Sequence, residues 1–362
     1  MKGVMRFWST SKRSVYSFRK MKTYEKKYFC EFDKHAIKSY CAIHNITEDK
    51  NLGDITEVDV NKLETVDLLT HGSPCQSFSF IGAKEGGDED SGTKSSLMWY
   101  TMKNVRKTMP KVVIWENVKA VLSPNNIHNF NKYIEQLDEL GYNSYWEVTN
   151  PKFCNIPQNR ERLFVVSIRK DIDNGKFKFP EHEELTADMF DYLDREVDEK
   201  YIVPAQVMTG YSNKTSIFKK RWLLKQPGDC AYCLTAKSGR AVITNNYVFN
   251  DWDLYKNLPC ALSDIDWLAA HPDIKVRSLT SLEYWRLQCF PEELYYIAQK
   301  AGVSDAQLYK QAGNSINVEV IYRIFKNLYI AIPEIFNGMT YGSLFSGIGA
   351  FEVALDRLYE EI

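Results

Sequence analysis

The cysteine at position 75 has neighbours that suit a nucleophile. It lies in the run Gly72-Ser73-Pro74-Cys75-Gln76, where a proline restrains the backbone, and a loop containing Gly82, Gly86 and Gly87 follows. A free cysteine is usually a small buried hydrophobe, but polar neighbours and a loop able to close over a ligand favour an exposed thiol. We therefore predict that Cys75 performs nucleophilic catalysis.

A carboxylate and two guanidinium groups could share a site with this cysteine. Glu116 follows the apolar run 112–115, and at the mouth of a buried strand its pKa should rise, so that it could share a proton with a ring nitrogen. The alternative is an exposed loop carboxylate. Arg160 and Arg162 precede the apolar run 163–166 and alternate with one intervening side chain, so both could point into one cleft. Planar guanidinium donors suit a carbonyl oxygen or a phosphate.

The run Phe345-Ser346-Gly347-Ile348-Gly349 lies between a predicted strand and a predicted helix, where glycines let the backbone approach a ligand closely. Glu31, after a neighbouring predicted strand, suits a pair of ribose hydroxyls, and Asp54 could accept from an adenine amino group. A third glycine is missing, which favours a nucleoside cofactor without a pyrophosphate. A plain tight turn is the alternative.

Cys230 and Cys233 have the C-x-x-C spacing of a zinc or redox motif. No second close pair of cysteines exists, and Cys260 and Cys289 have no nearby histidine. We therefore expect no tetrahedral zinc site and no other metal site.

The elements that must position these residues alternate along the chain. Apolar runs with β-branched or aromatic content predict strands at residues 28–32, 66–70, 112–115, 163–168 and 344–346. Helical spacing predicts helices at residues 34–44, 97–107, 127–140, 281–288, 304–310, 318–330 and 351–359. The alternation predicts a parallel α/β sheet. Ligands bind at the carboxyl ends of such strands, which would bring the cysteine, the glutamate and the glycine turn to one crevice.

Composition narrows the class of protein. The 362 residues are 44% hydrophobic and 26% charged, which predicts one large folded domain or two unequal ones. No apolar run approaches the roughly 18 residues that a membrane span needs, and eight scattered cysteines do not form a disulfide framework. We expect an intracellular chain, in the cytoplasm or nucleoid, with no membrane partner.

The charges are segregated although the net charge is only −1. Residues 1–27 are basic, residues 181–199 acidic, and residues 204–250 basic with interleaved aromatic side chains. A solvated face is an equally good interpretation of the first segment. The last segment favours contact with phosphates.

Six motifs together resemble those of the DNA (cytosine-5)-methyltransferases. The motifs are Gly72-Ser73-Pro74-Cys75-Gln76, Glu116-Asn117-Val118, Gln158-x-Arg160-x-Arg162, Arg277-x-Leu279-Thr280-x-x-Glu283-x-x-Arg286-Leu287-Gln288-x-Phe290-Pro291, Gln311-x-Gly313-Asn314-Ser315 and Phe345-x-Gly347-x-Gly349. The resemblance covers nearly the whole chain outside residues 1–26 and 180–275.

The resemblance implies a Rossmann-like, doubly wound α/β methyltransferase sheet with a smaller, irregular target-recognition domain. The implied parts are a basic segment (1–26), a catalytic domain (27–178 and 277–362, including the cofactor strand and helix at 341–362) and the recognition domain (179–276). The implied reaction flips a cytosine out of double-stranded DNA, because its ring carbons are unreachable while stacked. The implied cofactor is S-adenosylmethionine. We expect the enzyme to act as a monomer, sequence-specifically, as in restriction-modification.

The resemblance also implies roles for individual residues. Cys75 would attack carbon 6 of the cytosine, Glu116 would bind nitrogen 3, and Arg162 would hold the carbonyl while Arg160 supports the loop. The implied cofactor-binding residues are Phe345, Gly347, Gly349, Glu31, Phe32, Asp54, Ile55, Gly72, Pro74, Leu97 and Asn314. The implied substrate-binding residues are Gln76, Ser79, Asn117, Gln158, Leu234, Thr235, Lys237 and Arg240.

The order of the motifs departs from the family pattern. The glycine motif usually opens the chain, but here it comes last, so the order resembles a circular permutation. If so, the strand 341–346 and the helix 351–359 must dock beside the strand 28–32. The Thr-Leu pair that is common in the family's recognition domain is also missing. The most similar stretch of this sequence is Cys233-Leu234-Thr235.

Two alternatives keep the same fold. One is the same chemistry on structured RNA, as in the transfer-RNA branch of the family, and the other is a catalytically lapsed DNA-binding protein. Intact Cys75, Glu116, Arg160 and Arg162 argue against the lapsed form. A nicotinamide oxidoreductase would need a pyrophosphate-binding glycine loop, which is missing.

Overall fold

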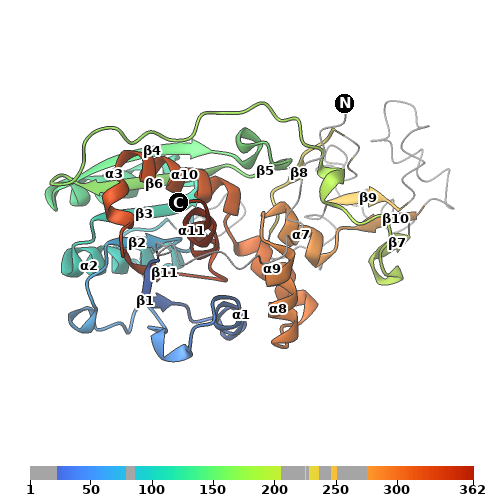
Figure 1. The fold of residues 1–362 in the computed structure, drawn as a ribbon, viewed down its shortest axis with the longest axis horizontal. Coiled ribbons are helices and arrows are strands. Elements are labelled where there is room, and N and C mark those ends of the chain that lie inside the picture. Colours follow the sequence, from blue (N-terminus) through green and yellow to red (C-terminus); the bar gives the residue numbers. More distant parts are fainter. Residues whose placement is uncertain (1–22, 79–85, 205–224, 226–227, 236–245, 251–274) are drawn as a thin grey trace, which may run out of the picture.

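A six-stranded sheet forms the centre of the computed structural model (Figure 1). The structure describes residues 23–78, 86–204, 225, 228–235, 246–250 and 275–362. In sheet order the strands are β1 (Glu25–Cys30), β11 (Thr340–Leu344), β2 (Leu68–His71), β3 (Val112–Val118), β6 (Arg162–Arg169) and β4 (Tyr142–Thr149). β1 begins at Glu25, within the basic segment expected to precede the catalytic domain.

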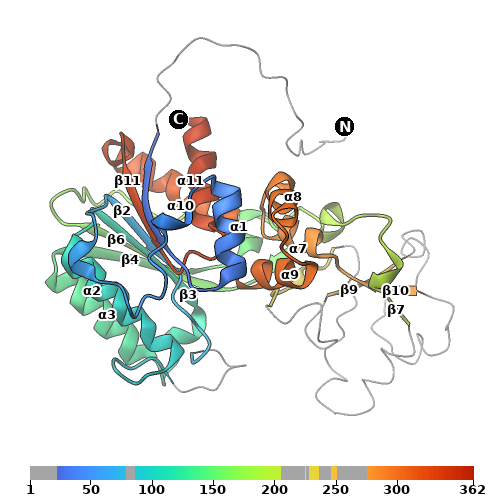
Figure 2. The same cartoon turned by 90° about the horizontal axis from the view of Figure 1, so that it is seen from below.

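Helices cover both faces of this sheet (Figure 2). Successive strand side chains point to opposite faces, so Leu68 of β2 joins one apolar core and Leu69 joins the other. The helices α2 (Met98–Thr108) and α3 (Ile127–Glu139) pack on the Leu69 side, and α10 (Val318–Ala331) and α11 (Ala350–Glu361) pack on the Leu68 side. The doubly wound α/β fold predicted from the sequence is therefore present.

The last strand and helix dock where the unusual motif order requires them. β11 pairs in parallel with β1 on one side and with β2 on the other. The ring of Tyr24, just before β1, lies 5.0 Å from the ring of Tyr359 in α11. Tyr40 of α1 (Lys34–His44) donates a 2.7 Å hydrogen bond to the buried carboxylate of Glu352 in α11. The predicted docking beside the strand 28–32 is confirmed.

The expectation of a wholly parallel sheet is wrong at β6. β1, β11, β2 and β3 run in parallel, but β6 runs antiparallel to both β3 and β4. β4 was not predicted, because it is an edge strand of partly exposed, largely polar side chains with no apolar run. The reversal brings the start of β6 to the carboxyl end of β3, where Arg162 pairs with Val118. Without it, Arg160 and Arg162 would lie at the opposite edge from Cys75.

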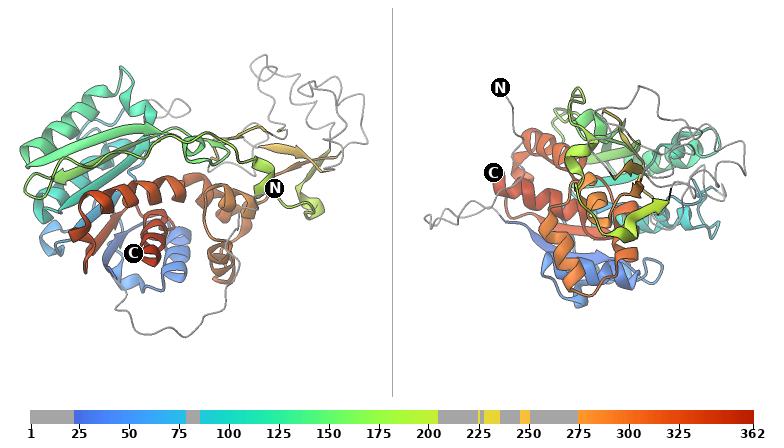
Figure 3. Two further views of the ribbon diagram at one scale, coloured as in Figure 1. Left: turned by 45° about the horizontal axis from the view of Figure 1, so that its top comes forward. Right: turned by 90° about the vertical axis from the view of Figure 1, so that its right-hand side faces the viewer.

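A small sheet lies at one end of the molecule, beyond three helices (Figure 3). These helices are α7 (Ser281–Leu287), α8 (Glu292–Lys300), which was not predicted, and α9 (Asp305–Asn314). The described strands in this part are short: β7 (Ile202–Pro204), β8 (Ala231–Tyr232), β9 (Tyr247–Phe249) and β10 (Lys275–Ser278). Two of them flank β10 in a small antiparallel sheet, and β8 pairs in parallel with β5 (Gln158–Asn159), immediately before Arg160.

A buried ion pair fixes the start of α7. Arg277 and Glu283 are both fully buried and lie 2.8 Å apart. The carboxylate of Glu283 also accepts hydrogen bonds from the backbone N–H groups of Thr280 and Asp194. A buried pair whose remaining acceptor sites are also used is held in one geometry.

Within the described ranges, no helix is long and apolar enough to cross a membrane.

Candidate active site

Three strand ends bring the predicted catalytic side chains to one edge of the sheet. Cys75 lies on the loop after β2, Glu116 lies near the end of β3, and Arg162 begins the antiparallel strand β6. Within the loop, the backbone N–H of Phe78 donates to the carbonyl of Cys75 at 3.1 Å. The described loop thus turns immediately after the cysteine.

Glu116 and Arg162 form an ion pair inside this edge. Nε of Arg162 lies 3.1 Å from Oε1 of Glu116, whose side chain is almost completely buried. Burial raises the pKa of the Glu116 carboxyl, and Arg162 opposes that rise. The other carboxylate oxygen faces Gly72, where a Cβ atom would lie 3.5 Å away. Glu116 is therefore a carboxyl able to take up a proton, as its position in the sequence predicted.

The thiol of Cys75 responds to the same groups. Burial raises the pKa of Cys75, Arg162 and Arg160 oppose that rise, and Glu116 adds to it. The side chain is a free cysteine and is partly buried. Burial therefore disfavours the thiolate of Cys75, and a positive charge at Arg162 favours it.

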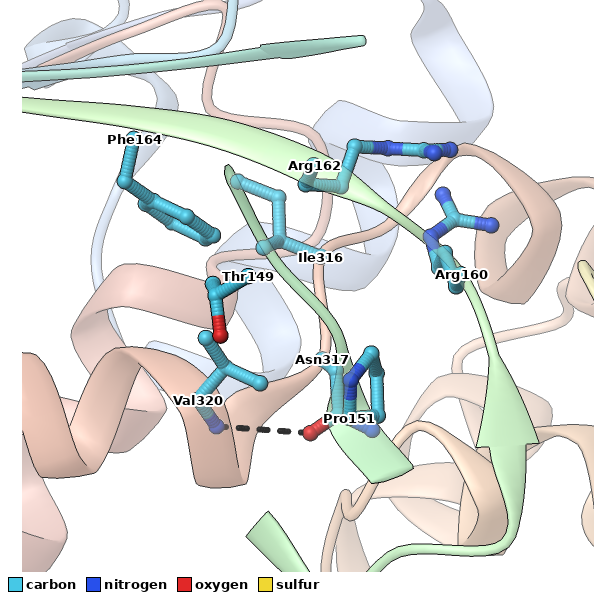
Figure 4. Close-up of a pocket in the computed structure, with 8 residues that line it drawn as sticks. All are labelled: Thr149, Pro151, Arg160, Arg162, Phe164, Ile316, Asn317 and Val320. Carbon is cyan, nitrogen blue, oxygen red and sulfur yellow. Dashed lines mark hydrogen bonds between the residues drawn. The ribbon is translucent and has the colours of Figure 1, made fainter. Parts of the chain in front are cut away.

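Arg160 lies next to Arg162 (Figure 4) but makes different contacts. It is almost fully buried, and its guanidinium donates to the carbonyls of Leu234 (2.7 Å), Gly313 (3.1 Å) and Ser315 (2.7 Å). These bonds join three segments that are far apart in the sequence. The geometry fits a group that supports the site, whereas Arg162 is the arginine paired with the carboxylate.

A small, partly open hollow is lined in part by the two arginines (Figure 4). It is lined by Thr149, Pro151, Arg160, Arg162, Phe164, Ile316, Asn317 and Val320. Cys75 and Glu116 do not line it. The hollow therefore lies beside the predicted catalytic groups and is not itself the predicted substrate pocket.

The loop that carries Cys75 is held through Ser73, which the sequence did not single out. The Ser73 hydroxyl accepts from Nε1 of Trp115 at 3.1 Å and from Nδ2 of Asn117 at 3.1 Å. Nδ2 of Asn117 also donates to the Ser73 carbonyl at 3.1 Å. The only feature of the sequence that could have indicated this role of Ser73 is its hydroxyl group next to Pro74. Asn117, predicted to bind substrate, is buried and holds this loop.

The glycine turn and the end of β1 meet at the carboxylate of Glu31. One oxygen accepts from the backbone N–H groups of Phe32 and Asp33 (3.0 and 2.9 Å), and the other accepts from Gly347 (2.9 Å). Gly347 and Gly349 have φ values of 57° and 84°, which favour glycine. The side chain of Phe32 is 73% exposed beside this junction. An acceptor, a glycine turn and an open aromatic ring are thus brought together.

The other predicted cofactor residues have varied surroundings. Asp54 is exposed, and its carboxylate accepts from the backbone N–H (2.9 Å) and hydroxyl (2.8 Å) of Thr56. Ile55 is buried, Asn314 is exposed at the end of α9, and Leu97 is partly buried against the α2 core. The partly buried members of the set also include Gly72, Pro74 and Phe345.

Besides Asn117, the predicted substrate-binding residues divide into three groups. Gln76 is exposed and Thr235 is partly buried. Gln158 and Leu234 are buried and make internal bonds, since Gln158 donates to the Leu287 carbonyl at 3.1 Å and Leu234 accepts from Arg160. Ser79, Lys237 and Arg240 lie outside the described residues.

Across the described ranges, no three histidine, cysteine or carboxylate side chains gather as metal ligands would.

Sequence comparisons find related proteins. A family model for C-5 cytosine-specific DNA methylase matches residues 15–329, ending before β11 and α11. The type II methyltransferase M2.ScrFI of Lactococcus lactis subsp. cremoris is 35% identical, over 77% of this chain and 71% of its own. The orphan methyltransferase M.SPRI of Bacillus phage SPR is 29% identical, over 84% of this chain and 92% of its own.

Solved structures share the fold. The S. pombe Dnmt2 methyltransferase superimposes with a TM-score of 0.61 at 19% identity, covering 84% of this chain and 90% of that chain. The Entamoeba histolytica methyltransferase EhMeth gives 0.59 at 16% identity, covering 84% and 98%. At these identities the likeness concerns the fold alone.

Proposed function

Because the chain belongs to the C-5 cytosine-specific DNA methylase family, we propose that it methylates carbon 5 of a cytosine flipped out of double-stranded DNA. The observation that carries the proposal is the 3.1 Å pair of Glu116 and Arg162 at the sheet edge that also bears Cys75. A nucleophile, a proton-sharing carboxyl and a guanidinium donor are the three groups that activation of a cytosine ring requires.

The reaction begins at the thiol of Cys75. The thiol gives its proton to solvent, and its thiolate forms a bond to carbon 6 of the cytosine. The electrons of the bond between carbons 5 and 6 move through the ring toward nitrogen 3, where the protonated carboxyl of Glu116 binds the ring. Arg162 donates hydrogen bonds to the ring carbonyl while it holds Glu116. Carbon 5 becomes nucleophilic as a result. After methylation, carbon 5 loses its proton to a base, the C–S bond breaks, and Cys75 leaves as a thiolate.

The residues around Glu31 fit a nucleoside cofactor. Glu31 offers carboxylate oxygens to ribose hydroxyls, the exposed ring of Phe32 offers a surface for adenine, and the turn at Gly347 leaves the backbone open. When bound, S-adenosylmethionine supplies the methyl group that carbon 5 accepts. Since Glu31 bonds to three backbone N–H groups, it also holds the glycine turn against β1.

A circularly permuted motif order explains how this cofactor site is assembled. β11 comes last in the chain but lies between β1 and β2 in the sheet. The family match ends at residue 329, ahead of the strand and helix that carry the glycine motif. The contact between Tyr24 and Tyr359 brings the start of β1 to the end of α11, so that a short link would restore the usual order.

Mapping of the methylated base tests the proposed function. The protein is incubated with S-adenosylmethionine and a mixed-sequence DNA duplex, and 5-methylcytosine is located base by base after bisulfite conversion. We expect methylation confined to one short motif, and none with the Cys75→Ala protein. Methylation of structured RNA but not of duplex DNA would show that the substrate is RNA. No methylation of either nucleic acid would favour a DNA-binding protein that has lost its catalytic activity.

A further inference from the structure

The sulfur of Cys233 lies between the guanidinium groups of the two site arginines. Nη1 of Arg160 is 3.4 Å from the sulfur, and Nη2 of Arg162 is 3.8 Å from it. The position follows from strand pairing, because β8 ends at Tyr232 and pairs with β5 immediately before Arg160. A cysteine from the 179–276 segment thus contacts both guanidinium groups of the catalytic part.

Arg160 needs a negative partner that its other contacts do not supply. It is 4% exposed, and apart from Cys233 its side-chain partners are three neutral carbonyls. Across the described ranges, no carboxylate oxygen lies within ion-pair distance of Arg160. A buried cation without an anion is costly, and a second cation beside it raises the cost. Of the described groups that contact Arg160, Cys233 is the one that can become an anion.

We propose that Cys233 is a positioning residue of the active site, whose sulfur supplies the negative charge shared by Arg160 and Arg162. It holds the two guanidinium groups side by side and so keeps Arg162 oriented toward Glu116. It also ties the segment around β8 to the catalytic edge. The catalytic consequence rests on the proposed function, but the charge on Cys233 does not.

The surrounding charges support an ionised sulfur. Burial raises the pKa of the Cys233 thiol, but Arg160 and Arg162 outweigh burial and lower it below the ordinary value. Among the described residues, the other titratable groups near these arginines are Glu116, across Arg162, and Cys75, which lies within the field of both guanidinium groups. Burial raises the pKa of Cys230, three residues away, and Lys225 and Lys152 only partly oppose it. Cys230 is therefore a matched control.

Alkylation of the whole protein by iodoacetamide measures the charge on each cysteine. The thiolate sulfur forms a bond to the methylene carbon, the carbon–iodine bond breaks, and iodide leaves. Rates are followed by mass spectrometry, with fragment ions that separate Cys230 from Cys233. We expect the Cys233 rate to level off at a lower pH than the Cys230 rate, which rises up to about 10-fold per pH unit.

The Arg160→Met protein should restore a steep pH dependence at Cys233. An equally steep dependence in the unmodified protein, or no effect of Arg160→Met, would overturn the proposal. If iodoacetamide does not reach Cys233, the ultraviolet absorbance of thiolates decides: below the ordinary pKa of a thiol, the parent protein should show more thiolate absorbance than Cys233→Ala. Equal absorbance would also overturn it.

Steady-state kinetics with DNA test the positioning role. We expect Cys233→Ala to lower kcat about 10- to 100-fold with little change in KM, because a misplaced guanidinium acts mainly in the transition state. Cys233→Asp keeps a negative charge and should recover most of kcat, and Cys230→Ala should match the parent. If Cys233→Ala and Cys233→Asp lower kcat equally, the charge of Cys233 has no role, and the proposal is wrong. An inactive parent protein with an ionised Cys233 would instead count against the proposed function alone.

Discussion

Replacing each site arginine by methionine should distinguish the structural role of Arg160 from the catalytic role of Arg162. Methionine retains much of the side-chain volume but removes the charge and all N–H donors. Arg160→Met deprives three backbone carbonyls of a donor, whereas Arg162→Met removes the partner of Glu116. We therefore expect Arg160→Met to act mainly on stability and Arg162→Met mainly on turnover.

The cost of Arg160→Met follows from which carbonyls lose their partners. The Ser315 carbonyl keeps a 3.3 Å hydrogen bond from Gln288, and the Leu234 carbonyl keeps a 3.6 Å contact with the Cys233 sulfur. The Gly313 carbonyl loses its Arg160 donor. Each buried acceptor left unpaired costs about 1–3 kcal/mol. Removal of a buried charge offsets part of this cost. We expect the free energy of unfolding to fall by about 1–3 kcal/mol.

Arg162→Met should be less destabilising, because Glu116 can become neutral when its partner is lost. Its kcat should fall about 100- to 1,000-fold, as when a hydrogen-bond donor to a developing charge is removed. Urea unfolding followed by tryptophan fluorescence measures the first effect, and methyl transfer at a temperature where both variants are folded measures the second. Normal unfolding of Arg160→Met combined with a loss of turnover like that of Arg162→Met would refute the reasoning.

Four further outcomes are expected. Cys75→Ala should abolish methyl transfer while calorimetry shows nearly unchanged S-adenosylmethionine binding, and normal turnover would exclude Cys75 as the nucleophile. Phe345→Ala should weaken that binding about 10-fold by loss of a ring contact, and a crystal of the complex with Phe345 far from the ligand would contradict the proposed cofactor site. Arg162→Met should move the pH–rate profile to higher pH, because Arg162 lowers the pKa of Cys75, and an unmoved profile would contradict this. Burial raises the pKa of Glu352, so the folded protein binds the proton more tightly and stability is lost as pH rises through that pKa. In urea titrations, Glu352→Gln should therefore be more stable than the parent protein at neutral pH but not at acidic pH. An equal difference in the free energy of unfolding at the two pH values would contradict this prediction.

Local signals predicted much of the fold. The helix predicted at 34–44 matches α1, because Asp33 caps its N-terminus by accepting from His35 (2.9 Å) and Asn45 ends it in a left-handed conformation. The apolar runs predicted the buried strands, since both faces of the sheet are covered. The edge strand β4 escaped prediction because its partly exposed side chains carry no continuous apolar run.

The motifs predicted which residue types gather at the site but not how they are used. Glu116 and Arg162 were both singled out, yet their ion pair depends on the antiparallel direction of β6. Asn117 was expected to face substrate, but packing gives its amide to Ser73. A side-chain bond of this kind depends on the exact approach of two loops, which neither periodicity nor spacing encodes.

The sequence by itself determined the chemistry available to this protein: a thiol after a proline, a carboxyl at a strand end, two alternating guanidinium groups and a glycine turn. Only the tertiary structure decided which groups meet. Strand direction placed Arg162 against Glu116, and the pairing of β5 with β8 placed Cys233 beside both arginines. Residue types and local propensity are properties of short segments. Contacts between segments more than 70 residues apart depend on how the sheet and its cores pack as a whole.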